Sequence, residues 1–175
     1  MRTLATLDLK NYDPAWRRYR RFAVRAVIFR GNDLLMVRNR AAGFYKFPGG
    51  GIEHGESHLD TLIRETKEEL GLSVLPDSVR ELGRIREIRR SIYRKCEIFD
   101  HTSYYYYAKI EDAVTKSHPE KYEAEHGFEL ACVSPQTAYR TNQRISSAGR
   151  CTFLLREAYI LEWLIKKQQV RHHKK

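Results

Sequence analysis

The segment from Pro48 to Gly71, PGGGIEHGESHLDTLIRETKEELG, constrains the fold most, because a glycine-rich loop runs directly into a helical pattern. Glycines let the loop backbone adopt positive φ and pass close to another chain or to a ligand. Ser57 and Asp60 form a capping-box pattern, and Gly71 is a typical stop signal. We predict a helix over residues 57–70.

This helix carries an acidic face beside its apolar one. The apolar stripe spans about 100° and comprises Leu59, Leu62, Ile63, Thr66 and Leu70. Glu65 and Glu69 lie at i,i+4, where like charges destabilise a helix by roughly 0.2–0.5 kcal/mol. Glu68 joins them, and Arg64 is placed to pair with it. Three carboxylates within two turns suit a hard divalent cation, although a solvated acidic face is the alternative.

Composition favours one soluble domain in a reducing compartment. The 175 residues suffice for one core, and no apolar run approaches the about 18 residues that a membrane helix needs. The first residues lack a signal peptide's apolar region, and the three cysteines form no CxxC pair. We therefore expect a cytoplasmic protein. The net charge of +10 indicates an anionic partner, and nucleotides, nucleic acid and acidic membranes all fit it.

Strand and helix patterns alternate irregularly along the chain. Period-2 patterns predict strands over 22–29, 34–37, 44–47, 81–88, 103–110 and 129–133, and helical spacing predicts a last helix over 151–167. Without regular βαβ alternation, we expect an α+β fold with a mixed sheet flanked by helices. We expect an N-terminal extension over 1–20, the domain over 21–167 and a basic C-terminal tail over 168–175.

The segment Gly50 to Leu72 resembles the Nudix box. That pattern is a glycine, five residues, a glutamate, seven residues, then REUXEEXGU, where U is aliphatic. The residues that match are Gly50, Glu56, Arg64, Glu65, Glu68, Glu69, Gly71 and Leu72. Thr66 departs from it, standing where the first aliphatic residue is expected.

The resemblance implies an α/β/α sandwich around a mixed sheet and hydrolysis of a nucleoside diphosphate linked to another moiety. It implies Mg²⁺, or Mn²⁺ in its place, with Glu65 and Glu69 as principal ligands. Glu68 would be a further ligand or activate water, Glu56 would support the metal, and Arg64 would orient a carboxylate. Many relatives dimerise, so a homodimer is an open alternative.

The general base is left open by this resemblance. It is either a box glutamate or an acid from a separate loop, where the candidates are Glu123, Glu125 and Glu129. Glu125 is preferred, because it precedes the predicted strand over 129–133 by a few residues and so could reach back over the cleft. For each of the three, a solvated loop acid is the alternative.

Substrate contacts are expected outside the acidic face. Arg25 lies on the face of its strand opposite to the apolar residues, so it would either contact phosphate in the cleft or form an ion pair on a half-exposed sheet. Arg38 and Lys46 are similar candidates for phosphate contact. Gly50 would let the loop approach the substrate. In the tyrosine run 104–107, alternate rings share a face and would either stack on a base or fill the core.

We therefore expect a metal-dependent pyrophosphohydrolase that acts on a nucleotide-type small molecule. The class includes nucleoside triphosphates, nucleotide sugars and dinucleoside polyphosphates. One alternative is removal of pyrophosphate or a cap from RNA 5′ ends, although no RNA-binding module is legible and RNA is not favoured. Another is a non-catalytic nucleotide sensor, which the full set of box glutamates argues against. We expect no membrane partner.

Overall fold

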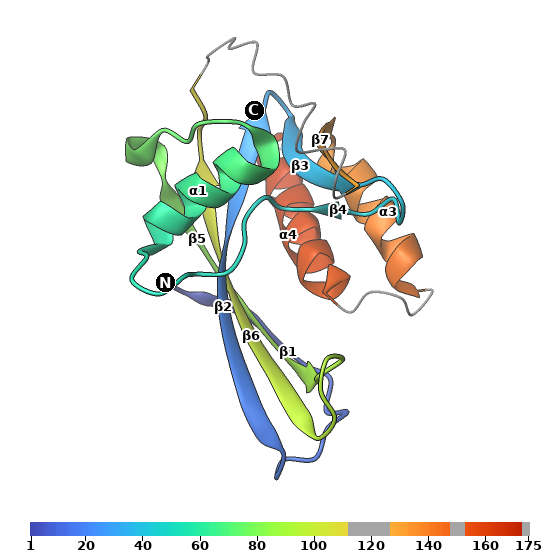
Figure 1. Cartoon of the computed structure of the whole chain (residues 1–175). Helices are drawn as coiled ribbons and strands as arrows, with labels where there is room; N and C mark the ends of the chain where they lie inside the picture. The colour runs from blue at the N-terminus through green and yellow to red at the C-terminus, as the bar shows by residue number, and fades with distance from the viewer. Residues whose placement is uncertain (112–126, 148–152, 173–175) are drawn as a thin grey trace.

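The computed structural model describes residues 1–111, 127–147 and 153–172, which form a seven-stranded sheet between two layers of helix (Figure 1). Helix α1 covers one face, and α3 and α4 cover the other, as expected for an α/β/α sandwich. The elements are β1 (Thr3–Asp8), β2 (Arg17–Arg30), β3 (Asp33–Asn39), β4 (Tyr45–Lys46), α1 (His58–Leu70), the 3₁₀ turn η1 (Pro76–Ser78), β5 (Arg80–Arg90), β6 (Glu97–Ala108), β7 (Phe128–Val133), α3 (Pro135–Ser147) and α4 (Leu154–His172).

The sheet is mixed, as its sequence patterns predict. The strand order is β1-β5-β6-β2-β3-β4, and β7 pairs with β3. β2 runs parallel to β6, and β1 runs parallel to β5, whereas the other pairs are antiparallel. Since β2 pairs with β6 from Arg17 to Ile28, this long strand joins both halves of the sheet.

The chain before residue 22 is part of this sheet. β1 and the first residues of β2 extend it into an arm, which we define as residues 3–8, 17–21 and 86–101 (Figure 1). Arginines at positions 17, 18, 20 and 21 interrupt the apolar alternation, so the sequence pattern starts β2 only at residue 22. At the other end, residues 168–172, expected in the tail, continue α4.

Helix α3 is not predicted from the sequence, because its residues are mostly polar. Its start nevertheless carries a local signal: Ser134 accepts a hydrogen bond from the backbone N–H of Thr137 at 3.2 Å, and Pro135 opens the helix. Serine before a proline at the first helical position is a typical helix start.

Two apolar clusters hold the layers together. The α1 face of the sheet buries Val24, Ala26, Ile28, Leu35, Val37, Leu62 and Leu70. The opposite face buries Val27, Met36, Phe47, Ile85, Tyr105, Ile160, Leu161 and Leu164. The tyrosine run divides as its alternation predicts, since Tyr105 is fully buried with α4 while Tyr104 and Tyr106 pack on the α1 side.

Helix α1 begins and ends as its sequence indicates. Ser57 and Asp60 each accept a hydrogen bond from the other's backbone N–H at 3.1 Å, and Gly71 adopts a φ of 66°. Thr66 is fully buried, so the threonine at the aliphatic position of the box serves the core. Leu59, expected in the apolar stripe, is instead 37% exposed. Among the described residues, no helix combines the length and apolar character that crossing a membrane requires.

We expect Leu62→Ala to lower the free energy of unfolding by about 2–5 kcal/mol, because it empties part of the core between α1 and the sheet. Leu59→Ala, the same change on an exposed face of α1, is the matched control and should cost less than about 1 kcal/mol. Urea unfolding followed by circular dichroism measures both. Equal losses would contradict the assignment of the buried face.

Candidate active site

The guanidinium of Arg64 is the centre of the acidic cluster. Its Nε and Nη2 donate to the two carboxylate oxygens of Glu56, at 2.7 and 3.0 Å. Its Nη1 donates to Glu65 at 2.9 Å and to Glu68 at 3.1 Å. Its Nη2 also reaches the carbonyl oxygen of Gly51 at 3.2 Å. One cation on α1 therefore holds three carboxylates and the loop that precedes the helix.

Glu56 is the carboxylate that Arg64 binds most closely. It also accepts a hydrogen bond from the hydroxyl of Thr61 at 2.8 Å and one from the backbone N–H of Glu53 at 3.1 Å. The hydrogen bonds from Arg64 lower the pKa of Glu56 to about 2. The group is thus ionised at neutral pH, and it fixes the loop before α1 against the helix.

Glu69 is bound by a second cation. The Nζ of Lys46 lies 2.5 Å from one of its carboxylate oxygens, and the backbone N–H of Gly49 donates to the other at 2.8 Å. Lys46 also lies over the ring of Phe128, at 4.8 Å from the centroid. Lys46, expected to contact substrate, therefore lies within the acidic cluster itself.

Glu65 accepts a hydrogen bond from Arg64 and is 14% exposed. Burial raises the pKa of its carboxyl, opposed by the hydrogen bond from Arg64 and reinforced by the charge of Glu69. The loop passes directly against it: a Cβ added at Gly50 would lie 2.2 Å from a carboxylate oxygen of Glu65. A side chain at this position would therefore have to displace the Glu65 carboxylate.

The loop is fixed to β2 by backbone hydrogen bonds. The N–H of Val24 donates to Gly50 at 3.0 Å, and the N–H of Ile52 donates to Phe22 at 3.1 Å. A Cβ at Gly49 would lie 2.2 Å from the carbonyl oxygen of Val24. The glycine-rich loop thus makes two close approaches: Gly49 to the backbone of β2 and Gly50 to the carboxylate of Glu65.

Two arginines that were predicted to contact the substrate, Arg25 and Arg38, instead bind groups of the protein itself. Arg25 is only 8% exposed, and its Nη1 donates to the carbonyl oxygens of Phe47 and Gly49. It stabilises the loop from the α4 side, which corrects the expectation that it faces an open cleft. Arg38 forms an ion pair with Glu129 at 3.1 Å.

Of the three candidate bases outside the box, the described residues include only Glu129. Glu129 is held by Arg38 and, at 2.9 Å, by Arg40, at the outer edge of β3 and β7. Glu123 and Glu125 lie outside the described residues. Glu68, at 46% exposure, is the most accessible of the four box carboxylates.

The donor set fits a divalent cation in charge and chemistry. The four carboxylates of Glu56, Glu65, Glu68 and Glu69 face two cations, so two negative charges remain unbalanced. The oxygens of these groups are the ligands that Mg²⁺ and Mn²⁺ prefer. Within the described residues, however, no three acidic, histidine or cysteine side chains already converge as a metal centre. Arg64 and Lys46 engage the carboxylates instead.

A family model of the NUDIX domain matches residues 19–148. The chain belongs to the Nudix hydrolase family. A segment of 53 residues is 38% identical to "Putative ADP-ribose pyrophosphatase YjhB" of Bacillus subtilis (strain 168), and it covers 30% of this chain and 26% of that protein.

One solved structure shares the fold. A NUDIX hydrolase from Nitrosomonas europaea superposes with a TM-score of 0.57 and 18% identity, over 85% of this chain and 91% of that one. The ORF135 protein of E. coli gives a TM-score of 0.45 and 22% identity, over 70% and 79%. At 18% identity, the likeness to the Nitrosomonas europaea protein shows the shared fold of this Nudix hydrolase.

We expect Gly50→Ala to weaken Mn²⁺ binding at least about tenfold, because the new methyl group must displace the Glu65 carboxylate. Gly51→Ala is the matched control, since its Cβ would come no closer than 3.4 Å to Arg21. Titration of Mn²⁺ followed by electron paramagnetic resonance measures the free ion in both variants. Unchanged binding in Gly50→Ala would contradict the role of Glu65 as a ligand.

The lowered pKa of Glu56 predicts a pH dependence of stability. Its ionised form stabilises the fold above its ordinary pKa of 4.5, and this contribution is lost as pH falls through about 2. The wild type should therefore exceed Glu56→Gln in stability at pH 6, and the gap should narrow below pH 4.5. Urea unfolding at a series of pH values measures it, with Glu111→Gln, the same kind of change at an exposed position away from Arg64, as a control that should parallel the wild type.

Proposed function

We propose that this Nudix hydrolase is a pyrophosphohydrolase that depends on a divalent metal and cleaves the diphosphate linkage of a nucleoside diphosphate derivative. The observation that carries the proposal is the acidic cluster with two unbalanced negative charges, held against a glycine-rich loop. The name of the Bacillus subtilis relative, "Putative ADP-ribose pyrophosphatase YjhB", supports the substrate class.

Mg²⁺ or Mn²⁺ would be held by Glu65, Glu68 and Glu69, with Glu56 in support. Such an ion supplies neutralisation of the diphosphate charge and a lower pKa for a bound water. The chain's own groups do the rest. Arg64 orients Glu65 and Glu68 through one nitrogen, which keeps both carboxylates on the loop side of α1.

Proton transfer in this mechanism falls to an accessible acid. Glu68 is half exposed and is held on one oxygen by Arg64, so its other oxygen is available to accept a proton from water. Glu125 remains the candidate outside the box. Lys46 can exchange its ion-pair partner, because an ammonium that pairs with Glu69 can equally pair with a substrate phosphate.

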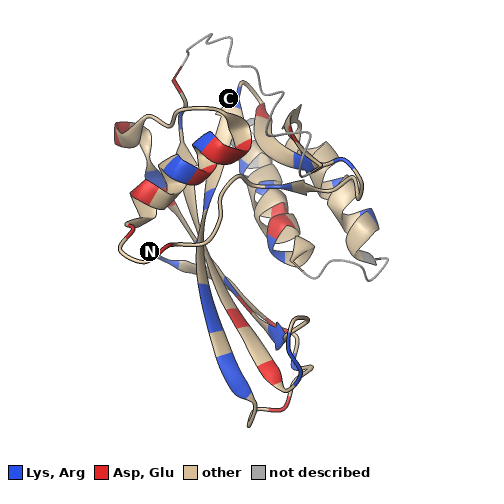
Figure 2. Cartoon of the chain, viewed as in Figure 1, with Lys and Arg blue, Asp and Glu red and all other residues tan. Residues whose placement is uncertain are grey.

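Basic residues on the arm favour a second candidate, an enzyme that acts on RNA 5′ ends. Lys and Arg recur along the arm part of β2, where Asp and Glu are fewer and lie mainly on β6, while α1 carries several Asp and Glu (Figure 2). Binding along such a surface releases counterions, so activity on RNA would fall steeply with salt. Activity on a small nucleotide would change much less.

We expect Glu69→Gln to fold normally and to lose most of its Mg²⁺-dependent turnover, at least about 100-fold. Glu162→Gln, the same change at an exposed ion pair on α4, is the matched control and should keep wild-type turnover. The measurement is phosphate-bond hydrolysis over a panel of nucleoside diphosphate derivatives and a 5′-triphosphate RNA. Near-normal activity of Glu69→Gln would contradict the proposed site. Absence of hydrolysis by the wild type over the whole panel would contradict it too.

A further inference from the structure

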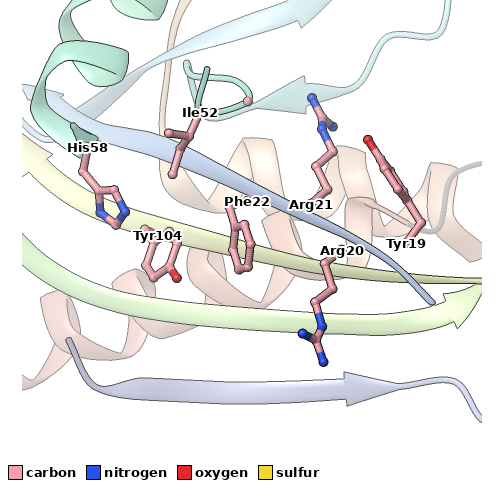
Figure 3. A pocket seen from close by; sticks show the side chains of 8 residues that line it. Tyr19, Arg20, Arg21, Phe22, Ile52, His58 and Tyr104 are labelled. Atoms are coloured by element: carbon pink, nitrogen blue, oxygen red, sulfur yellow. The ribbon is translucent and has the colours of Figure 1, made fainter. Parts of the chain in front are cut away.

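A pocket of about 500 Å³ opens on the α1 face of the sheet, beside the acidic cluster (Figure 3). Its lining includes Arg20, Arg21, Phe22, Gly51, His58 and Tyr104. Gly51 belongs to both sites, because its carbonyl oxygen accepts the hydrogen bond from Arg64 at 3.2 Å. A ligand in the pocket therefore lies within one residue of the loop position that touches Glu65.

The floor of the pocket is aromatic. The ring of Phe22 is stacked near Tyr104, with centroids 6.5 Å apart and planes 27° apart. His58 packs on the other side of Tyr104 at 4.4 Å, and its Nδ1 lies 2.6 Å from the hydroxyl of Tyr106. Phe22 is 47% exposed, so one ring of this supported group is open to solvent. Such a ring on a sheet is a stacking surface for a planar base.

Two arginines flank the exposed ring. Figure 3 shows Arg21 and Arg20 directed to opposite sides of β2, with Arg20 on the same side as Phe22. Arg21 Nη2 lies 3.4 Å from the point where a Cβ at Gly51 would stand. Within the described part of the chain, neither guanidinium donates a hydrogen bond or forms an ion pair. Both charges are thus available to an anion.

The pocket continues into a second hollow of about 330 Å³ across the sheet. The two share Arg20, Phe22 and Tyr104, and the second adds Arg84 and Arg86 of β5. Asp100 lies there too, but its carboxylate is bound by Arg86 at 2.7 Å and by Arg18 at 3.0 Å. The three arginines of the hollow against one aspartate leave a surplus of positive charge, which suits a phosphate.

The pocket and the adjoining hollow together form one groove. We propose that this groove binds the nucleoside of the substrate together with a further phosphate on its ribose. The base stacks on Phe22, the diphosphate passes Arg21 and Gly51 into the acidic cluster, and the ribose phosphate meets Arg20. This inference rests on the proposed function and narrows its substrate class to nucleoside diphosphate derivatives that are also phosphorylated on the ribose. A free nucleotide and the first nucleotide of an RNA 5′ end share this chemistry.

Product binding tests the site without turnover. The probes are adenosine 5′-phosphate and adenosine 3′,5′-bisphosphate, titrated by isothermal calorimetry in the presence of Mg²⁺. We expect the bisphosphate to bind the wild type at least about tenfold more tightly. Phe22→Ala should weaken both probes about tenfold, within the range that loss of one stacked base gives.

Arg20→Gln separates the ribose phosphate from the base. It should remove the advantage of the bisphosphate and leave the monophosphate nearly unchanged. Ile92→Ala, which alters a 70% exposed residue of the arm outside the groove, is the control and should bind both probes like the wild type. Equal affinity of the wild type for the two probes, or unchanged binding in Phe22→Ala, would overturn the proposal.

A second comparison distinguishes the two sources of the ligand. A 5′-phosphorylated trinucleotide that binds more tightly than the bisphosphate, with a steep loss in salt, identifies an RNA end, whereas weaker or equal binding identifies a free nucleotide. The proposed function fails separately. Absence of metal-dependent turnover in both wild type and Glu69→Gln would refute it, whatever the product titrations show.

Discussion

The site depends on the guanidinium of Arg64, which lies among carboxylates that repel one another. Three carboxylates on one side of a helix and its preceding loop repel one another, and Arg64 has five N–H donors in a planar fork with which to offset that repulsion. It uses them on Glu56, Glu65, Glu68 and the Gly51 carbonyl. The helix, the loop and these three carboxylates are therefore fixed relative to one another by a single side chain.

Lys46 and the glycines complete the cluster from the strand side. Lys46 reaches Glu69 from β4, and Gly50 brings the backbone into contact with Glu65. Neither contact is between sequence neighbours, yet both arise because the loop leaves the strand and returns along β2 before α1 begins. The loop backbone thus contacts two of the carboxylates on α1, Glu65 and Glu69.

Local patterns predicted much of this arrangement, and long-range contacts set the rest. The caps of α1, the mixed sheet and the alternation of the tyrosine run follow from residues close in sequence. The start of β2, the polar helix α3 and the burial of Arg25 do not, because tertiary packing overrides weak or charged patterns there. The ion pair of Arg38 and the exposed ring of Phe22 required the strand order, since their partners lie on neighbouring strands. The ion pair of Lys46 required the packing of α1 on the sheet, since its partner Glu69 lies on that helix.

The long strand β2 has a further consequence. The loop is hydrogen-bonded to it at Phe22 and Val24, so the open aromatic ring and the loop that touches Glu65 are attached to the same extended backbone. A strand advances about 3.3 Å per residue and resists bending within its sheet. The distance between the ring of Phe22 and the loop beside Glu65 is therefore fixed by β2. It would set how far the base of a bound nucleotide lies from the diphosphate bond at the acidic cluster.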